Sequence, residues 1–238
     1  MVERIELVMV LVGMLAAATL FRKFPKLILD SDGKRARPSV SVIIPARNEA
    51  RILPLLMTDL RQQKELAFEI LCVDDDSEDT TATVARDYGA KVIKASGKPK
   101  GWLGKAWACF IGAKAAQGDL LLFLDADVRL REDALGRLVQ TQQTLGGTIS
   151  VQPKHLAEKS YEQLSLIFNL VQIGANGAAM TKPPKIGLYG PVILMERGDY
   201  WQVGGHEVVA GDIVEDVALG LKLKEAGLDY QTSSVTMT

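Results

Sequence analysis

Two acidic clusters each follow an apolar run, and their spacing suits the binding of a cation or a polar ligand. Asp125 and Asp127 stand directly after Leu120–Leu124. Two carboxylates one residue apart can reach the same divalent ion from one loop. Asp74–Asp76 follow the run Ile70–Val73, and three adjacent carboxylates repel one another unless they diverge around a turn, cap a helix or bind donors. Each cluster is also compatible with an exposed turn or a helix cap.

A further acidic pair, Glu215 and Asp216, stands at the opening of a predicted helix, Asp212–Ala226. An acidic residue in a first turn commonly serves only to complement the helix dipole. A carboxylate is also the usual group that takes a proton from an alcohol, once burial brings its pKa toward the working pH. Both interpretations stay open at this point.

One basic segment, Lys98–Lys105, reads Lys-Pro-Lys-Gly-Trp-Leu-Gly-Lys and runs into a predicted helix. Glycines give the backbone freedom, and lysines near a helix N-terminus suit phosphate oxygens. The spacing GxxxxGK[ST] is absent, so the segment is not a P-loop. Taken alone, it predicts a solvated basic loop.

The elements that must position these groups alternate between strand and helix. Four short runs are close to continuously apolar, as in strands covered on both faces, and helical segments separate them. The predicted strands are Val40–Pro45, Glu69–Val73, Ala90–Ala95 and Leu120–Leu124, and the predicted helices are Glu49–Gln63, Asp79–Tyr88, Lys105–Gln117 and Glu132–Thr144. This order predicts an α/β fold with a doubly wound, mainly parallel sheet, flanking helices, and ligands at the carboxyl ends of the strands.

The later third of the chain is less regular. Extended segments are predicted at Thr148–Gln152, Val192–Glu196 and Tyr230–Thr236, and an apolar helix at Tyr161–Met180. Because a domain seldom ends on a strand directly after a helix, we expect the natural domain to continue beyond Thr238.

Length and charge limit the class of protein. The 238 residues suit one α/β domain with a short additional segment. Lysine and arginine number 28, against 29 aspartate and glutamate residues. No overall positive field therefore points to nucleic acid as a partner, and any anionic ligand must be held locally.

The N-terminal segment differs in kind from the rest. Leu7–Phe21 is uncharged and mostly apolar, and Arg22, Lys23 and Lys26 follow it. About 15 helical residues span roughly 23 Å, less than the roughly 30 Å of a hydrocarbon core, so a core helix or a surface-lying segment stays an alternative. We predict a membrane-anchor helix over 1–24, a linker over 25–39 and a globular domain over 40–238, which the positive-inside rule places on the cytoplasmic side of the cell membrane.

Taken together, four motifs resemble those of a family-2 glycosyltransferase with the GT-A fold. They are Ser41–Glu49 (SVIIPARNE), Val73–Ser77 (VDDDS), Leu124–Asp127 (LDAD) and Val214–Val217 (VEDV), in the order of the family. The resemblance covers about Val40 to Leu228. It implies a GT-A catalytic domain that uses a nucleotide-diphosphate sugar, most simply UDP-glucose, together with Mg²⁺ or Mn²⁺.

The resemblance also implies roles for particular residues. Those bordering the nucleotide sugar would be Pro45, Ala46, Arg47, Glu49, Asp74 at the base, Lys105, Asp125 near the ribose, and Asp127, which would also bind the metal ion. Asp216 would be the catalytic base of an in-line, inverting displacement. No covalent glycosyl-enzyme is required.

Within the family, Gly101–Lys105 and Val203–His206 are most similar to carotenoid and other lipid-modifying glucosyltransferases. This similarity implies a lipid-like hydroxyl or carboxyl acceptor and places Glu215, His206 and Trp102 on the acceptor side. For His206, a structural hydrogen bond is the alternative. Two alternatives stay open: a polysaccharide synthase-like transferase, whose Gln-x-x-Arg-Trp motif would follow the base helix beyond Thr238, and a noncatalytic nucleotide- or lipid-binding scaffold of the same fold.

Overall fold

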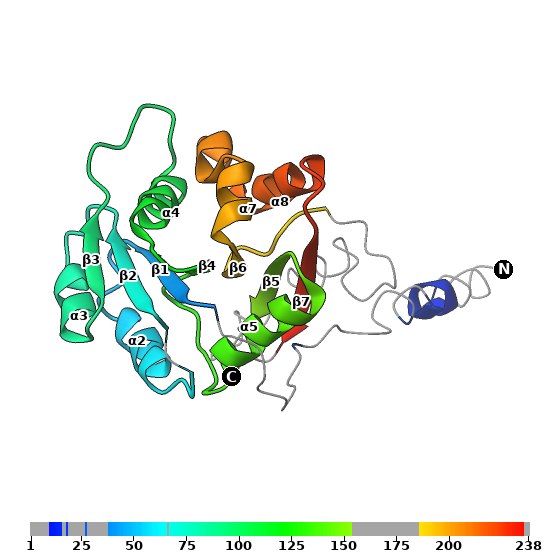
Figure 1. Ribbon diagram of the computed structural model, residues 1–238, viewed down its shortest axis with the longest axis horizontal. Helices are drawn as coiled ribbons and strands as arrows, with labels where there is room; N and C mark the ends of the chain where they lie inside the picture. Colours follow the sequence, from blue (N-terminus) through cyan, green and yellow to red (C-terminus); the bar gives the residue numbers. More distant parts are fainter. Residues whose placement is uncertain are drawn as a thin grey trace.

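The computed structural model describes residues 10–15, 18, 27, 38–65, 67–153 and 186–235 (Figure 1). The strands are β1 (Val40–Ala46), β2 (Glu69–Asp74), β3 (Lys91–Lys94), β4 (Leu120–Leu124), β5 (Thr148–Pro153), β6 (Val192–Glu196) and β7 (Tyr230–Val235). The helices are α2 (Leu53–Arg61), α3 (Thr81–Asp87), α4 (Gly104–Ala115), α5 (Ala134–Leu145), α7 (Arg197–Gln202), the 3₁₀ helix η2 (Gly205–Val209) and α8 (Glu215–Glu225). The α/β alternation predicted for the first half of the chain is confirmed.

All seven strands form one sheet in the order β3-β2-β1-β4-β6-β5-β7. The pairs β1 with β2, β1 with β4, β2 with β3 and β5 with β7 are parallel. β6 runs antiparallel to both of its neighbours, β4 and β5. The sheet is therefore mostly parallel, as expected, but it also contains antiparallel pairs. The sequence did not predict them, because the hydrophobic pattern of a short apolar strand does not encode its direction.

Helices cover both faces of the sheet and create two cores. Successive strand side chains point to opposite faces, so in β1 Val42 and Ile44 pack toward α2, α3 and α5, whereas Ile43 packs toward α4, α7 and α8. Figure 1 shows these two groups of helices on opposite sides of the strands. Burial on both faces explains the continuous apolar runs of β1, β2 and β4. For β3, an edge strand whose Lys91 and Lys94 are exposed, the prediction of a strand covered on both faces was wrong.

Some element boundaries differ from the predicted ones. α2 begins at Leu53 rather than at Glu49, and Pro54 lies in its first turn, where proline is tolerated. The residues before it form turns, with Asn48 in the left-handed region at φ 56°. The short helices α7 and η2 were not predicted, because six and five residues are too few to show a helical periodicity.

The predicted anchor and linker lie mostly outside the described residues, as do residues 161–180. Within the described part of the N-terminal segment, residues 10–15 are helical. Among the described residues, none of the helices has both the length and the apolar character needed to cross a bilayer.

The topology gathers several chain segments at one edge of the sheet. β1, β2 and β4 are parallel, so their carboxyl ends, at Ala46, Asp74 and Leu124, lie at the same edge. Because β6 is antiparallel, its amino end joins them: Val192 pairs with Leu124, and the amide of Asp125 donates to the carbonyl of Pro191 at 3.0 Å. Ligands of open α/β sheets bind at this edge.

Candidate active site

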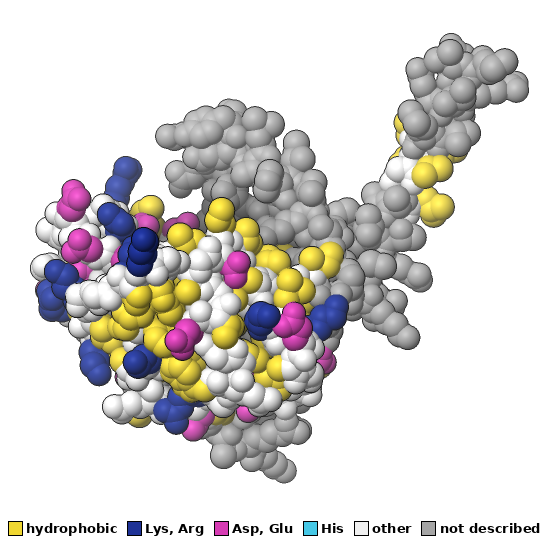
Figure 2. Space-filling view, turned by 90° about the horizontal axis from the view of Figure 1, so that it is seen from above, with side chains coloured by type: hydrophobic (Ala, Val, Ile, Leu, Met, Phe, Trp, Pro, Cys, Tyr) yellow, Lys and Arg dark blue, Asp and Glu magenta, His cyan; other side chains and the backbone are white. Residues whose placement is uncertain are grey.

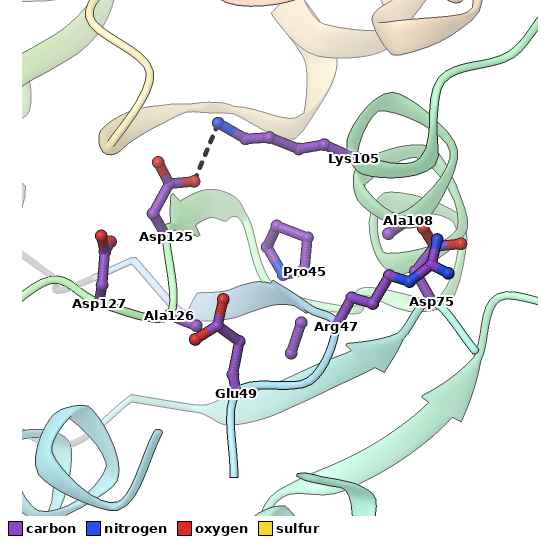
Figure 3. Close-up of a pocket in the computed structure, with 10 residues that line it drawn as sticks. Pro45, Arg47, Glu49, Asp75, Lys105, Ala108, Asp125, Ala126 and Asp127 are labelled. Carbon is purple, nitrogen blue, oxygen red and sulfur yellow. Dashed lines mark ion pairs between the residues drawn. The ribbon is translucent and has the colours of Figure 1, made fainter. Parts of the chain in front are cut away.

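A cavity of about 370 Å³ opens at this edge of the sheet (Figure 3). Its lining residues are Pro45, Ala46, Arg47, Glu49, Asp75, Lys105, Ala108, Asp125, Ala126 and Asp127. In the view of Figure 3, Arg47 and Asp75 lie on one side of the opening, Asp125 and Asp127 on the other, and Glu49 between them. Seven predicted donor-site residues from three separate segments thus meet in one place.

The loops that follow β1 and β2 are tied together by hydrogen bonds. The amide of Asn48 donates to Ser77 Oγ at 3.0 Å, and the amide of Glu78 donates to Asn48 Oδ1 at 2.8 Å. The amide of Glu49 donates to Thr81 Oγ1 at 2.8 Å. Asparagine tolerates the left-handed conformation that this turn needs. These bonds hold the loop that carries Arg47 and Glu49 against the loop that follows β2.

Of the two aspartates at the carboxyl end of β2, Asp74 and Asp75, only the second lies in the cavity lining. Asp74, assigned to the nucleotide base by resemblance, is buried outside the cavity lining, and its Oδ1 accepts a hydrogen bond from the amide of Ser77 at 3.2 Å. Asp75 lines the cavity instead. Neighbouring side chains of an extended segment point to opposite sides, so only one of the pair can face the ligand while the other caps the turn.

Lys105, near the start of α4, joins three carboxylates. Its Nζ lies 2.9 Å from Asp125 Oδ1, 3.4 Å from Glu215 Oε1 and 3.6 Å from Asp216 Oδ2. Figure 3 shows the lysine side chain extending from α4 toward Asp125. The ion pairs therefore link the acidic motif after β4 to the one at the start of α8, 91 residues later in the chain.

Burial and crowding of charge change the acidity of this cluster. Burial raises the pKa of Asp216 to about 6; Glu215 and Asp125 add to the increase, and Lys105 opposes it. Burial also raises the pKa of Asp125, against the effect of Lys105. Burial alone would lower the pKa of Lys105, but Asp216 and Asp125 raise it well above its usual range. Lys105 thus stays charged, and Asp216 has the acidity of a group that can exchange protons near neutral pH.

Two glycines allow the backbone to approach the carboxylates of Asp216 and Asp75 closely. A Cβ atom on Gly190, just before β6, would lie 1.9 Å from Asp216 Oδ2. A Cβ atom on Gly104, the first residue of α4, would lie 2.1 Å from Asp75 Oδ2. Neither position was predicted from the sequence, because a close approach depends on tertiary packing and leaves no local pattern.

The acidic side chains of the cavity suit a hard divalent cation. Asp127 is exposed at the opening, and Asp125 and Glu49 also line it. Burial, followed by the nearby charge of Asp127, raises the pKa of Glu49. Among the described residues, however, no group of three or more acidic, histidine or cysteine side chains is arranged to hold an ion. Proteins commonly hold Mg²⁺ with one or two carboxylates, while phosphate and water complete the shell.

The three residues expected on the acceptor side lie in different settings. Glu215 is in the Lys105 cluster. His206 is buried, with Nδ1 2.9 Å from the hydroxyl of Tyr200, and that hydroxyl also accepts from the His206 amide at 3.1 Å. Burial and the charge of Lys105 lower the pKa of His206 to about 3, which supports the alternative of a structural hydrogen bond. Trp102 packs edge-on against Trp107 at 5.0 Å.

Solved structures with a similar fold include a mannosyltransferase from Pyrobaculum calidifontis in complex with GDP-Man and Mn²⁺, with a TM-score of 0.65 and 19% identity over 96% of this chain and 64% of that chain. A glucosyl-3-phosphoglycerate synthase from M. tuberculosis has a TM-score of 0.55 and 20% identity over 84% of this chain and 72% of that chain. At such identities the likeness establishes the fold alone. With the cavity at the sheet edge, it defines a domain of the GT-A type.

The model of glycosyl transferase family 2 matches residues 41–204, and the chain belongs to this family. It is 41% identical over 204 residues to a 4,4'-diaponeurosporenoate glycosyltransferase of Staphylococcus haemolyticus (strain JCSC1435), covering 81% of this chain and 54% of that protein. Identity to the protein of the same name from Staphylococcus aureus (strain USA300) is 38% over 189 residues, covering 76% and 50%. The resemblance to carotenoid glycosyltransferases is confirmed, and the chain spans about half the length of these relatives.

Proposed function

We propose that this chain forms the catalytic domain of an inverting glycosyltransferase that transfers glucose from UDP-glucose to a hydroxyl or carboxyl group of a lipid or carotenoid-type acceptor. The observation that carries the proposal is the position of Asp216. It is a carboxylate whose side chain is only 13% exposed and whose pKa is raised, and it is joined through Lys105 to Asp125 on the cavity lining. This position supports Asp216 as the base that acts beside a cavity suited to a nucleotide.

In the proposed reaction, Asp216 accepts the proton of the acceptor hydroxyl as the acceptor oxygen forms a bond to the anomeric carbon. The bond from that carbon to the diphosphate oxygen breaks, and its electron pair leaves with UDP. The new bond lies on the opposite face of the sugar, so the configuration inverts. An acceptor carboxyl is already ionised at neutral pH and needs no base, so Asp216 matters most for hydroxyl acceptors and for water.

On the donor side, we assign the base edge of the nucleotide to Asp75, in place of Asp74, because Asp75 lines the cavity. Arg47 and Lys105 supply positive charge near the diphosphate. The cavity lining carries four carboxylates and only these two cations, so a bound diphosphate would add to a negative excess. A divalent ion, Mg²⁺ or Mn²⁺, held by Asp127 would offset that charge on the leaving group.

The names of the relatives support a carotenoid-type acceptor for the whole protein. The apolar segment Leu7–Phe21 and the basic residues after it support association with the cell membrane, with the domain on the cytoplasmic side. Both attributions belong to the proposal, as does the choice of UDP-glucose.

The test is the formation of UDP and free or transferred glucose from UDP-glucose with Mn²⁺, measured for the wild-type chain, Asp216→Asn and Asp212→Asn. Hydrolysis by water requires proton removal, so we expect Asp216→Asn to lose about 100-fold or more in rate. Asp212, an exposed acid just before α8, is the matched control and should change little. Equal rates in all three proteins would exclude Asp216 as the base, and UDP binding without any product in the wild type would favour the scaffold alternative.

A further inference from the structure

Large apolar side chains remain exposed beside the catalytic cluster. They are Leu103 before α4, Trp201 in α7, Val208 in η2, and Ile213 and Val214 before α8. Ile213 is 88% exposed. Figure 2, which views the molecule from above the helices α4, α7 and α8 of Figure 1, shows hydrophobic side chains gathered on this side of the molecule. We call these five residues the apolar face.

We propose that the apolar face lies against the surface of a lipid bilayer and thereby turns the catalytic cluster toward acceptors held in that bilayer. The proposal rests on the glycosyltransferase function for its purpose, but its test needs no turnover. It assigns the membrane contact to particular loops of the globular domain, separately from the N-terminal apolar segment.

The loops that carry the apolar face form one surface. The amide of Leu103 donates to the carbonyl of Ala210 at 2.8 Å. A Cβ atom on Gly211 would lie 3.2 Å from the carbonyl oxygen of Gly101. The segment before α4 is therefore in contact with the segment that leads into α8, and the exposed side chains of both share one side of the domain.

This surface directly adjoins the reactive groups. Leu103 is the N-cap of α4 and precedes Lys105 by two residues. Val214 is the N-cap of α8 and precedes Asp216 by two residues. Because Lys105 Nζ and Asp216 Oδ2 are 3.6 Å apart, both apolar loops reach the same charged cluster, and an acceptor that enters over them meets apolar surface first.

An aromatic cluster supports a bilayer as the occupant. Trp102, Trp107, Phe110 and Trp201 contact one another at centroid distances of 5.0 to 5.9 Å. Tryptophan is enriched where headgroups meet acyl chains, because its ring is apolar and its N–H is polar. The exposed face of this cluster, at Trp201, is part of the apolar face.

The charges near the apolar face also fit a bilayer surface. Lys98 and Lys100 are exposed in the loop before α4 and have no ion-pair partner within the described ranges. Long lysine stems can lie along an apolar surface while the ammonium reaches lipid phosphates. Glu207 and Asp212 are exposed nearby, so the local charge is balanced, and we expect apolar insertion rather than charge to carry the binding.

A second exposed apolar segment in the chain favours the same occupant. The helical residues 10–15 expose Val10, Leu11, Val12, Met14 and Leu15. The chain has two exposed apolar surfaces, one of them next to the proposed base. Contact of both surfaces with a bilayer explains this exposure better than contact with a second copy of the chain.

Intrinsic fluorescence can test the apolar face without interference from the N-terminal segment. The chain has three tryptophans, Trp102, Trp107 and Trp201, and all three belong to the aromatic cluster. The full chain is bound to vesicles of phosphatidylcholine and phosphatidylglycerol, with either brominated or ordinary acyl chains, and the bound fraction is measured by flotation. At equal bound fraction, we expect loss of tryptophan emission with the brominated lipid, because bromine quenches only by contact.

Matched variants make the result decisive. Val208→Glu with Ile213→Glu should abolish the quenching. The control is Phe68→Glu. Phe68 is 60% exposed and lies at the amino end of the sheet, where its amide donates to the carbonyl of Val40. Both Phe68→Glu and Asp216→Asn should retain the quenching. Thermal unfolding of each variant checks that it is folded. Absence of vesicle binding, binding without quenching, or quenching that survives Val208→Glu with Ile213→Glu in a folded protein would each overturn the proposal.

Discussion

Lys105 Nζ lies 3.6 Å from Asp216 Oδ2, although the two residues belong to different helices of the domain. The same ammonium also contacts Asp125 at 2.9 Å. This one side chain therefore couples the lining of the donor cavity to the proposed base. A diphosphate that draws Lys105 toward itself would alter the surroundings of Asp216 at the same time.

Replacing Lys105 with Met should separate these two roles. Without the ammonium, three carboxylates face one another, and the pKa of Asp216 should rise above its wild-type value because Lys105 lowers it. We expect a lower melting temperature and an acid limb of the pH–rate profile moved to higher pH. Lys114→Met, on an exposed turn of the same helix, is the control. A pH profile unchanged from wild type would refute the coupling.

Gly190→Ala tests the close approach to the base. The new methyl group would overlap Asp216 Oδ2, which sits at the end of a side chain that can rotate away. We therefore expect a small change in melting temperature, a fall in kcat of about 10-fold or more, and unchanged affinity for UDP. Gly198→Ala is the matched control, since nothing lies within 4 Å of a Cβ there. Equal kcat in the two variants would contradict the geometry.

Gly104→Ala tests the donor side in the same way. Its methyl group would overlap Asp75 Oδ2, so we expect weaker UDP binding in calorimetric titration, with the loss showing mainly in KM rather than kcat. The complementary variants Asp75→Asn and Asp74→Asn distinguish the neighbours. Asp75→Asn should weaken UDP binding, whereas Asp74→Asn should lower the melting temperature, because Asp74 accepts a turn hydrogen bond. The reverse pattern would restore the assignment of Asp74 as the residue that contacts the nucleotide base.

The pH dependence of hydrolysis should follow Asp216. The group acts as a base only when ionised, and its pKa is raised to about 6. We expect the rate to rise about tenfold per pH unit below that value and to level off above it. A profile that is flat from pH 5 to pH 8 would argue against Asp216.

The same ionisation affects stability, with a defined sign. The folded chain holds the Asp216 proton more tightly than the unfolded chain, whose carboxyl titrates near 4. Stability contributed by the protonated group is therefore present below about pH 4 and is lost as pH rises through about 6. Asp216→Asn removes this loss of stability on ionisation. The variant should therefore unfold at a higher temperature than wild type above pH 6, and at nearly the same temperature below pH 4. Scanning calorimetry at both pH values measures the difference.

Tyr200→Phe tests the structural role of His206. The Tyr200 hydroxyl contacts both Nδ1 and the amide of His206 in a buried setting. Its removal leaves two polar groups without this partner, which costs about 1 to 3 kcal/mol of unfolding free energy. We expect UDP affinity to be retained in the folded variant. A lost affinity at unchanged melting temperature would instead place His206 in the site.

Much of the donor side could be predicted from the sequence because its determinants are local. Continuous apolar runs identified β1, β2 and β4, and polar residues directly after such strands must lie at the ligand edge of a parallel sheet. Arg47, Glu49, Asp125 and Asp127, which follow β1 and β4, line one cavity for this reason. The antiparallel direction of β6 has no such local signal.

What could not be predicted depends on contacts between distant segments. Asp74 and Asp75 have the same side-chain chemistry, and only the turn hydrogen bond to Ser77 decides which one faces the ligand. A glycine is needed at position 190 because α8 brings the carboxylate of Asp216 against it. The burial of His206 results from packing against Tyr200 and Phe123.

The hydrogen bonds that join Asn48 to Ser77 and Glu78, and Glu49 to Thr81, have protein groups as both donor and acceptor. A nucleotide would therefore meet loops that are already ordered, and little further loss of conformational entropy in these loops would accompany binding. Amide hydrogen exchange of these loops should be slow from the outset. The association of UDP should accordingly resemble the filling of a rigid receptor, with a rate set by diffusion and charge rather than by loop closure.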